Sequence, residues 1–257
     1  EPTSGQVAFE GQDVLALDKK QLRQMRRRMQ IIFQDPYSSL NARMTISDII
    51  AEPLKLHKLC ANAAEREQRV NELMETVGLS QRLVNSYPHE LDGGRRQRVG
   101  IARALALNPS FIVCDEPVSA LDVSIQAQIL NLMQDLQEQM DLTYIFITHN
   151  LSVVNHLADE IAVMYLGQIV EKAPAVELFE QPQHPYTKAL LSAIPVPSLK
   201  KKREIQPLTG EISSPIDPPN ACRFAPRCPM ASARCTQGIP TLKDVGGGHQ
   251  VACFLYE

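Results

Sequence analysis

The feature that most constrains the fold is a short apolar run that ends in two acidic residues. The run FIVCDEP occupies residues 111–117 and places Asp115 and Glu116 directly after four apolar residues. Such a run is typical of a strand buried in a parallel sheet, and parallel sheets bind ligands at the carboxyl ends of their strands. One carboxylate at that edge can hold Mg²⁺ while the next orients a water, as nucleotide hydrolysis requires. The alternative is a structural strand that ends in a solvated turn.

Further apolar runs alternate with helix-forming segments along the chain. Residues 61–77 are rich in helix formers and are followed by Gly78, which is a typical helix end. Strands that alternate with helices predict an α/β domain with a largely parallel sheet. The predicted strands are residues 6–10, 29–34, 111–115, 144–148 and 161–165, and the predicted helices are 18–28, the region 47–87, 92–107, 124–140 and 151–157.

The composition excludes several classes of protein. The 257 residues are 44% hydrophobic and carry a formal net charge of -3, which gives no general reason to expect binding to nucleic acid or anionic membranes. The basic run at residues 19–28 is interpreted as a solvated helix face. No apolar run reaches the ~18 residues of a membrane-spanning helix, and no signal-peptide pattern begins the sequence. We therefore expect a cytoplasmic protein whose membrane role depends on partners.

Four more short segments gain meaning only when they are taken together. A glutamine at a strand end carries no information alone, and a histidine after a strand is more often structural. In their order along the chain, however, the segments resemble the motifs of the ATP-binding subunit of an ABC transporter. Gln34 matches the Q-loop, LDGGRRQRV at 91–99 the signature motif, Asp115 and Glu116 the Walker B motif, SALD at 119–122 the D-loop, and His149 the switch histidine.

The resemblance implies a fold and a nucleotide site. The fold is an α/β, ABC-type nucleotide-binding domain with a RecA-like core and a helical subdomain at about residues 47–108. The implied cofactors are ATP and Mg²⁺, with Asp115 bound to Mg²⁺ through water and Glu116 placing the water that attacks ATP. Gln34 and His149 are implied to sense the γ-phosphate and the metal.

The same resemblance implies residues that act across a nucleotide-sandwich dimer. Asp122 communicates between subunits, and Asp92, Gly93, Gly94 and Arg95 face the ATP held by the opposite subunit. The family has serine at Asp92 and glutamine at Arg95. Aspartate caps a helix about as well as serine, so we expect normal folding. A carboxylate brings like charge to the phosphate, however, so we predict a weakened or inactive half-site.

One family motif is missing from the chain. The sequence has no Gly-Lys dipeptide, so the loop GxxxxGKS/T that cradles the phosphates is absent. In the family, the segment resembling EPTSGQVAF at residues 1–9 lies shortly after the helix of that loop, and this chain begins with Glu1. We therefore interpret residues 1–180 as an ABC ATPase domain truncated before or within the Walker A region, and we expect this fragment alone to be inactive.

A change of composition after about residue 180 predicts a second, smaller module. A connector rich in Pro, Ser and Lys occupies residues 195–220. The segment QPQHPYTKALLSAIP at 181–195 and the cysteine region at 222–254 resemble the C-terminal extension of dipeptide and oligopeptide importer ATPases, most of all the second ATPase subunit of dipeptide importers. We assign residues 181–257 to this extension.

The extension implies partners and a location. By resemblance the partners are a second ABC ATPase subunit, two transmembrane permease subunits and an extracytoplasmic peptide-binding protein, without nucleic acid. The implied location is the cytoplasmic face of the inner membrane, where the permease subunits hold the protein.

Four cysteines gather in the extension, with the spacing C-x5-C-x6-C-x17-C. Grouped thiols in a cytosolic protein favour a metal over disulfides, but the spacing fits neither short zinc pairs nor common ferredoxin runs. Some importers of the family carry a 4Fe-4S cluster on such a tail, so the resemblance favours that cluster, with zinc and free thiols as alternatives. The four are Cys222, Cys228, Cys235 and Cys253, whereas Cys60 and Cys114 lie elsewhere.

Three functions are consistent with these patterns. The first is ATP hydrolysis that drives dipeptide or oligopeptide import. The second is a non-transport ABC ATPase of DNA repair or translation, which would share the motifs up to His149 but not the HPYT and four-cysteine tail. The third, suggested by Asp92 and the missing loop, is a catalytically impaired regulatory or iron–sulfur module.

Overall fold

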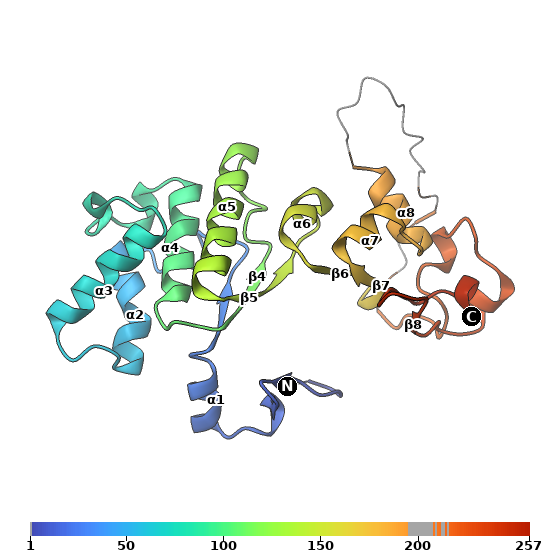
Figure 1. Cartoon of the computed structure of the whole chain (residues 1–257), viewed down its shortest axis with the longest axis horizontal. Helices are drawn as coiled ribbons and strands as arrows, with labels where there is room; N and C mark the ends of the chain where they lie inside the picture. The colour runs from blue at the N-terminus through green and yellow to red at the C-terminus, as the bar shows by residue number, and fades with distance from the viewer. Residues whose placement is uncertain (1, 195–207, 209, 212–213, 215) are drawn as a thin grey trace. The chain divides into compact units, whose positions relative to one another are not determined.

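The computed structural model describes residues 2–194, 208, 210, 211, 214 and 216–257. The chain forms two compact units, residues 1–149 and 150–257, which are described separately (Figure 1). The predicted connector at 195–220 lies mostly outside the described residues. Among the residues that the structure describes, no helix is long and apolar enough to cross a membrane.

A three-stranded parallel sheet forms the centre of the first unit. Its strands, in spatial order, are β3 (Met29–Ile32), β4 (Phe111–Asp115) and β5 (Thr143–Ile147). Asp115 at the end of β4 is opposite Ile147 at the end of β5. The parallel sheet predicted from the sequence is confirmed, and the segments that follow its strands leave from the same edge.

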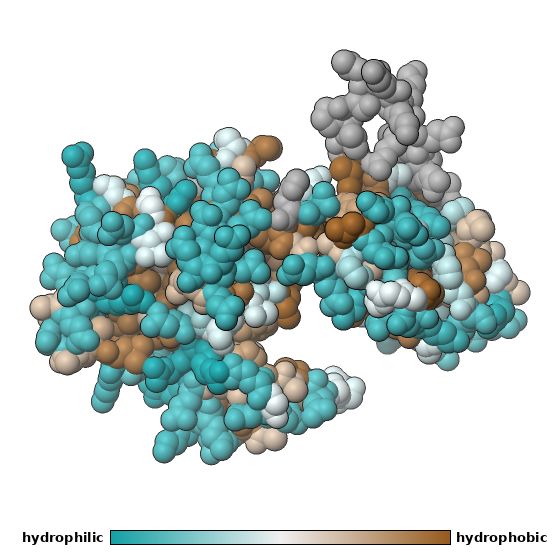
Figure 2. Space-filling view, in the orientation of Figure 1, coloured by the Kyte–Doolittle hydropathy of each residue, from teal (hydrophilic) through white to brown (hydrophobic). Residues whose placement is uncertain are grey.

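Helices cover one face of this sheet. The side chains of Asp18, Thr45, Asn62 and Asp92 accept backbone N–H groups at the starts of four of the helices, as N-caps do. Helices α2, α3 and α4 pack on one another, and α4 also contacts β3 and α5. The surface over α5 is mainly hydrophilic (Figure 2). The helices of the first unit are α1 (Lys19–Met25), α2 (Ile46–His57), α3 (Ala63–Thr76), α4 (Gly93–Leu105) and α5 (Val123–Met140).

The two faces of the sheet differ in burial. Ile112 and Cys114 of β4 point into the core formed with the helices and are at most 1% exposed, so Cys114 is a core residue. Side chains alternate between faces along a strand, and on the other face Ile145 is 52% and Ile147 47% exposed. The prediction of a buried strand at 144–148 is therefore wrong for the described chain, because Ile145 and Ile147 lie on this exposed face.

The first residues form a small hairpin instead of a longer strand. Strand β1 (Ala8–Phe9) pairs antiparallel with β2 (Gln12–Asp13), so the strand predicted at 6–10 is only two residues long. The ring of Phe9 lies 5.8 Å from that of Phe111 at the start of β4.

The second unit is built on an antiparallel sheet. Helices α6 (Leu151–Leu157), α7 (Ala175–Glu180) and α8 (Pro185–Ser192) accompany it, and Phe224 and Leu178 are buried in its core. Its strands, in spatial order, are β6 (Glu160–Tyr165), β7 (Gln168–Pro174), β9 (Gln250–Val251) and β8 (Lys243–Asp244).

The pairing of β7 with β9 ties the end of the chain to residues before 180. Glu171 is opposite Val251 in this pair. The compact unit consequently begins at Asn150, whereas the sequence analysis draws its boundary at 180 on a change of composition. A change of composition does not reveal a strand pair between segments this far apart.

Candidate nucleotide site and cysteine cavity

Three of the residues predicted from the sequence meet at Glu116, which is one of them. It directly follows β4, and its backbone is left-handed, with φ at 42°. Its carboxylate accepts a hydrogen bond from Gln34 Nε2 at 2.7 Å and one from His149 Nδ1 at 3.0 Å. Gln34 and His149 follow the two neighbouring strands, so the parallel sheet accounts for the meeting of all three side chains.

These contacts lower the pKa of the Glu116 carboxyl below its ordinary value. The hydrogen bond from His149 is the largest cause that lowers the pKa of Glu116, burial opposes it, and Gln34 lowers the pKa further. The Glu116 side chain is 22% exposed and that of His149 71%. An ionised carboxylate that remains open to water can orient a water molecule and accept its proton.

The neighbouring acids hold different positions. Asp115 is half-buried at the end of β4, on the edge where the Glu116 contacts form. The backbone N–H and the hydroxyl of Ser119 donate to the Glu116 carbonyl at 3.2 and 3.0 Å, so the SALD segment folds back on Glu116. Asp122 occupies the N-cap position of α5.

The signature segment begins α4 with an aspartate cap. Asp92 Oδ1 accepts the Arg95 backbone N–H at 2.8 Å, so the capped helix expected from the sequence is confirmed. Asp92 Oδ2 also lies 3.2 Å from the Arg95 guanidinium, and the side chains of Asp92 and Arg95 are 60% and 57% exposed. Exposed pairs contribute little to stability, but this one places a positive charge beside the carboxylate.

The two glycines of this segment allow close packing. A Cβ on Gly94 would lie 2.6 Å from Ile125 Cγ2, and one on Gly93 would lie 3.1 Å from Leu121 Cδ2. The start of α4 therefore packs directly on the SALD segment and the start of α5. This packing role of the two glycines was not predicted from the sequence, where they are expected only to face ATP.

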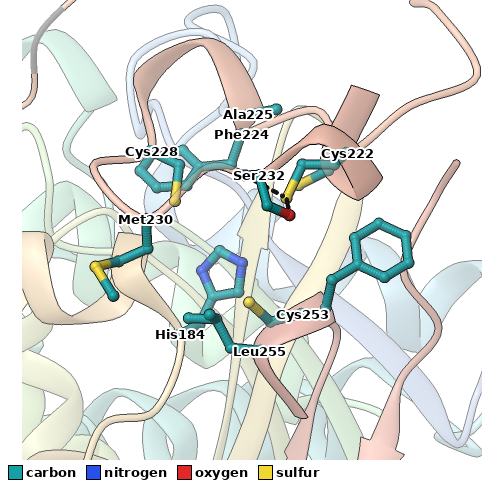
Figure 3. A pocket seen from close by; sticks show the side chains of 11 residues that line it. His184, Cys222, Phe224, Ala225, Cys228, Met230, Ser232, Cys253 and Leu255 are labelled. Carbon is teal, nitrogen blue, oxygen red and sulfur yellow. Dashed lines mark hydrogen bonds between the residues drawn. The ribbon is translucent and has the colours of Figure 1, made fainter. Parts of the chain in front are cut away.

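The four cysteines of the extension line one small cavity. Cys222, Cys228, Cys235 and Cys253 surround a volume of about 40 Å³ together with His184, and Figure 3 shows the ring of His184 among the labelled cysteines. All four are free thiols. Burial raises the pKa of Cys222, Cys228 and Cys253, and the other cysteines add to the increase.

The cysteine side chains and their arrangement give different indications about a bound metal. Four cysteine thiols are the usual ligands of an iron–sulfur cluster. Among the described residues, no three or more His, Cys, Asp or Glu side chains are arranged to hold a metal ion. The four cysteine side chains match the donor set of a cluster, whereas a single zinc ion needs four ligand atoms within about 2.3 Å of one position.

Two family models match the sequence. The model "Oligopeptide/dipeptide transporter, C-terminal region" matches residues 170–235, and the model "ABC transporter" matches residues 1–119.

Curated relatives match almost the whole chain. A probable peptide ABC transporter ATP-binding protein of Sinorhizobium fredii is 52% identical over 99% of this chain and 72% of its own length. The oligopeptide transport ATP-binding protein AppF of Bacillus subtilis is 51% identical over 99% of this chain and 78% of its own length. The chain belongs to the family of peptide ABC transporter ATP-binding proteins.

Solved structures of ABC proteins share the fold. The ATP-binding cassette MJ0796, determined as a dimer with ADP and Pi, aligns with a TM-score of 0.60 and 31% identity, over 68% of this chain and 75% of that one. The cbiO1 protein of Clostridium perfringens aligns with a TM-score of 0.62 and 25% identity, over 70% of each chain. The predicted ABC-type α/β fold is therefore confirmed.

Within this peptide-transporter ATPase, a buried polar group that the sequence did not predict lies beside the cysteine cavity. The Glu171 carboxylate accepts the backbone N–H groups of Gln183 at 2.6 Å and His184 at 3.1 Å, and it lies 2.7 Å from His249 Nε2. Glu171 is 0% exposed, and both histidines are 1% exposed. Burial lowers the pKa of His184 to about 4. The HPYT and GHQVACF segments contain these histidines, but nothing in the sequence marks Glu171 as buried.

Proposed function

We propose that this protein hydrolyses ATP to drive the import of dipeptides or oligopeptides across the cytoplasmic membrane. The observation that carries the proposal is the contact of Gln34 and His149 with the Glu116 carboxylate at the end of β4. The relatives named as peptide transport ATP-binding proteins support the substrate class. The match of residues 170–235 to the peptide-transporter C-terminal region disfavours an ABC ATPase of DNA repair or translation.

In this proposal Glu116, His149, Gln34 and Asp115 have distinct roles. Glu116, ionised and open to water, orients the attacking water and accepts its proton. His149 and Gln34 hold the carboxylate in place and respond to the γ-phosphate. Asp115 would hold Mg²⁺ through water, and the ion would supply positive charge to the phosphates.

Other residues act between subunits in this proposal. Asp122 communicates across a nucleotide-sandwich dimer. Asp92, Gly93, Gly94 and Arg95 face the ATP of the opposite subunit, where the Asp92 carboxylate weakens the half-site.

The assembly follows from the same proposal. The partners are a second ABC ATPase subunit, two transmembrane permease subunits and an extracytoplasmic peptide-binding protein, with no nucleic acid. The protein would lie at the cytoplasmic face of the inner membrane. Residues 1–180 serve as the ATPase domain without its phosphate loop, and residues 181–257 serve as the peptide-importer extension, although β9 of the extension pairs with β7.

The proposal includes a 4Fe-4S cluster held by Cys222, Cys228, Cys235 and Cys253. Its support is the four-thiol lining of one cavity, and zinc remains the alternative. The cluster would cross-link four positions spread over residues 222–253. Anaerobically purified protein should contain iron and absorb broadly in the visible range, and Cys222→Ser or Cys228→Ser should reduce both. Stoichiometric zinc without iron would favour the alternative.

Glu116→Gln tests the ATPase proposal. In the assembled transporter, with the other ATPase subunit's site silenced, we expect hydrolysis to fall at least a hundredfold while nucleotide binding persists, because general-base catalysis typically contributes about 10²–10⁴-fold. The amide can hydrogen-bond a water but cannot take its proton. The matched control is Glu138→Gln, an exposed residue of α5, which should leave turnover unchanged. Undiminished turnover in Glu116→Gln would refute the role of Glu116.

A further inference from the structure

His184 is the imidazole that lines the cysteine cavity. It occupies the N-cap position of α8 and is 1% exposed. Its ring lies among the labelled cysteines in Figure 3 and packs against Phe224, with the two ring centres 5.6 Å apart. None of the functions considered above uses this side chain.

The hydrogen bonds of His184 determine where its proton lies. Nδ1 accepts the backbone N–H of Tyr186 at 3.1 Å, which caps α8. A nitrogen that accepts a hydrogen bond carries no proton, so the ring is neutral and its proton is on Nε2. Nε2–H is therefore the one hydrogen-bond donor of the ring, since Nδ1 already accepts the Tyr186 N–H.

The backbone of His184 is held from outside the cavity. The Glu171 carboxylate accepts the backbone N–H of His184 at 3.1 Å and lies 2.7 Å from His249 Nε2. His249 precedes β9, and Cys253 follows that strand. Glu171 thus connects the start of α8, which carries His184, with the segment that carries Cys253.

We propose that His184 Nε2–H donates a hydrogen bond to a sulfur atom of the cluster or of its cysteine ligands, and that this bond raises the reduction potential of the cluster. The inference rests on the 4Fe-4S cluster of the proposed function. Reduction adds negative charge to the cluster, and a donor to sulfur stabilises that charge, so hydrogen bonds to sulfur are one of the protein's means of adjusting the potential.

Two substitutions separate the two roles of His184. Asn in place of His184 retains an acceptor that can cap α8 but does not reach into the cavity. Gln is longer and places an N–H donor near the position of Nε2. The control, His57→Asn, lies in the other compact unit at the end of α2.

The experiment is a redox titration of anaerobically purified full-length protein. For His184→Asn we expect the potential to fall, with the oxidised-to-reduced ratio changing about tenfold at a fixed potential, which is ~59 mV for a one-electron couple. His184→Gln should stay nearer the wild type, and His57→Asn should match it. If water entered the cavity of the Asn variant, it would donate hydrogen bonds to the cluster and raise its reduction potential. A lower potential in this variant therefore cannot result from solvation of the cluster.

The outcomes separate this inference from the proposed function. A wild type without iron or visible absorption overturns the cluster and this inference together. Equal potentials in wild type and His184→Asn overturn the inference alone and leave His184 as a helix cap. If the Asn variant does not retain its cluster, reduced wild type labelled with ¹⁵N-histidine decides the matter. Magnetic coupling between the cluster and an imidazole nitrogen supports the bond, and its absence overturns it.

Discussion

Asp92 serves the helix that it caps while placing negative charge where the proposed function brings phosphate. Its carboxylate caps α4 through the Arg95 N–H at 2.8 Å and pairs with the Arg95 guanidinium at 3.2 Å. Two like unit charges about 4 Å apart repel by about 4 kcal/mol at an effective dielectric of 20. The adjacent guanidinium offsets part of that repulsion, so we expect Asp92 to weaken the half-site of the proposed function.

Asp92→Ser should therefore raise ATP-dependent dimer closure and hydrolysis in the assembled transporter by about tenfold, because part of the 4 kcal/mol repulsion is removed. The melting temperature should change little, since serine and aspartate cap helices about equally well. Steady-state ATPase rates and thermal melts provide the measurement, and Asp92→Ala, which loses the cap, is the control for stability. An unchanged rate in the Ser variant would mean that the carboxylate does not lie against phosphate.

The Glu116 carboxyl should titrate below its ordinary range, and His149→Ala should raise its pKa. The His149 hydrogen bond is the largest cause of the lowered pKa. Because the carboxyl pKa is lower in the folded than in the unfolded chain, these hydrogen bonds stabilise the folded state at pH values above the unfolded-state pKa. That stabilisation is lost as the pH falls through the folded-state pKa. NMR titration of ¹³C-glutamate-labelled protein measures the shift, with the resonance assigned by Glu116→Gln. The same pKa in wild type and His149→Ala would show that the contact is absent in solution.

Among the elements, α4 and α5 meet where glycine allows their closest approach. Gly94→Ala would place a Cβ 2.6 Å from Ile125 Cγ2, and a β-branched side chain cannot easily rotate away. We expect a loss of about 1–3 kcal/mol in the free energy of unfolding. Denaturant unfolding measures this loss.

A second glycine of the same helix is the matched control for Gly94→Ala. A Cβ on Gly100 meets no atom within 4 Å, so Gly100→Ala should stabilise α4 by about 0.5–1 kcal/mol. Equal effects at the two positions would contradict the close packing of α4 on α5. Ile125→Ala combined with Gly94→Ala should recover part of the lost stability.

The sequence predicted these elements well where their signals are local. Asp92 and Asn62 cap helices at the starts, or within a residue or two of the starts, that composition predicted, because an N-cap acts on backbone groups two or three residues away. The burial of β5 was predicted wrongly, since it depends on what covers Ile145 and Ile147 rather than on the strand itself. Local patterns report periodicity, whereas burial depends on the rest of the fold.

At the scale of the whole molecule, the sequence predicted the meeting of Gln34, Glu116 and His149 better than the surroundings of the cysteines. Gln34, Glu116 and His149 each follow a strand, and a parallel sheet gathers such residues at one edge. Glu171 sits in a strand where an acid ordinarily indicates exposure. Its burial depends on donors from Gln183, His184 and His249, the last of them 78 residues away. No local pattern reveals partners that only the folded chain brings together.

The 257-residue chain should bind ATP only weakly, even though Gln34, Glu116 and His149 are assembled in it. ABC and other P-loop ATPases hold the phosphates through backbone N–H groups and a lysine of the loop GxxxxGKS/T, and this sequence contains no Gly-Lys dipeptide. In the proposed function these three residues act on the γ-phosphate and on water, so we expect them to contribute little to holding the nucleotide. We expect Mg-ATP to bind with a dissociation constant of about 1 mM or weaker, which corresponds to about -4 kcal/mol. Isothermal titration calorimetry measures it, with a thermal melt of the same sample to show that the chain is folded. Micromolar affinity would show that another part of the chain cradles the phosphates.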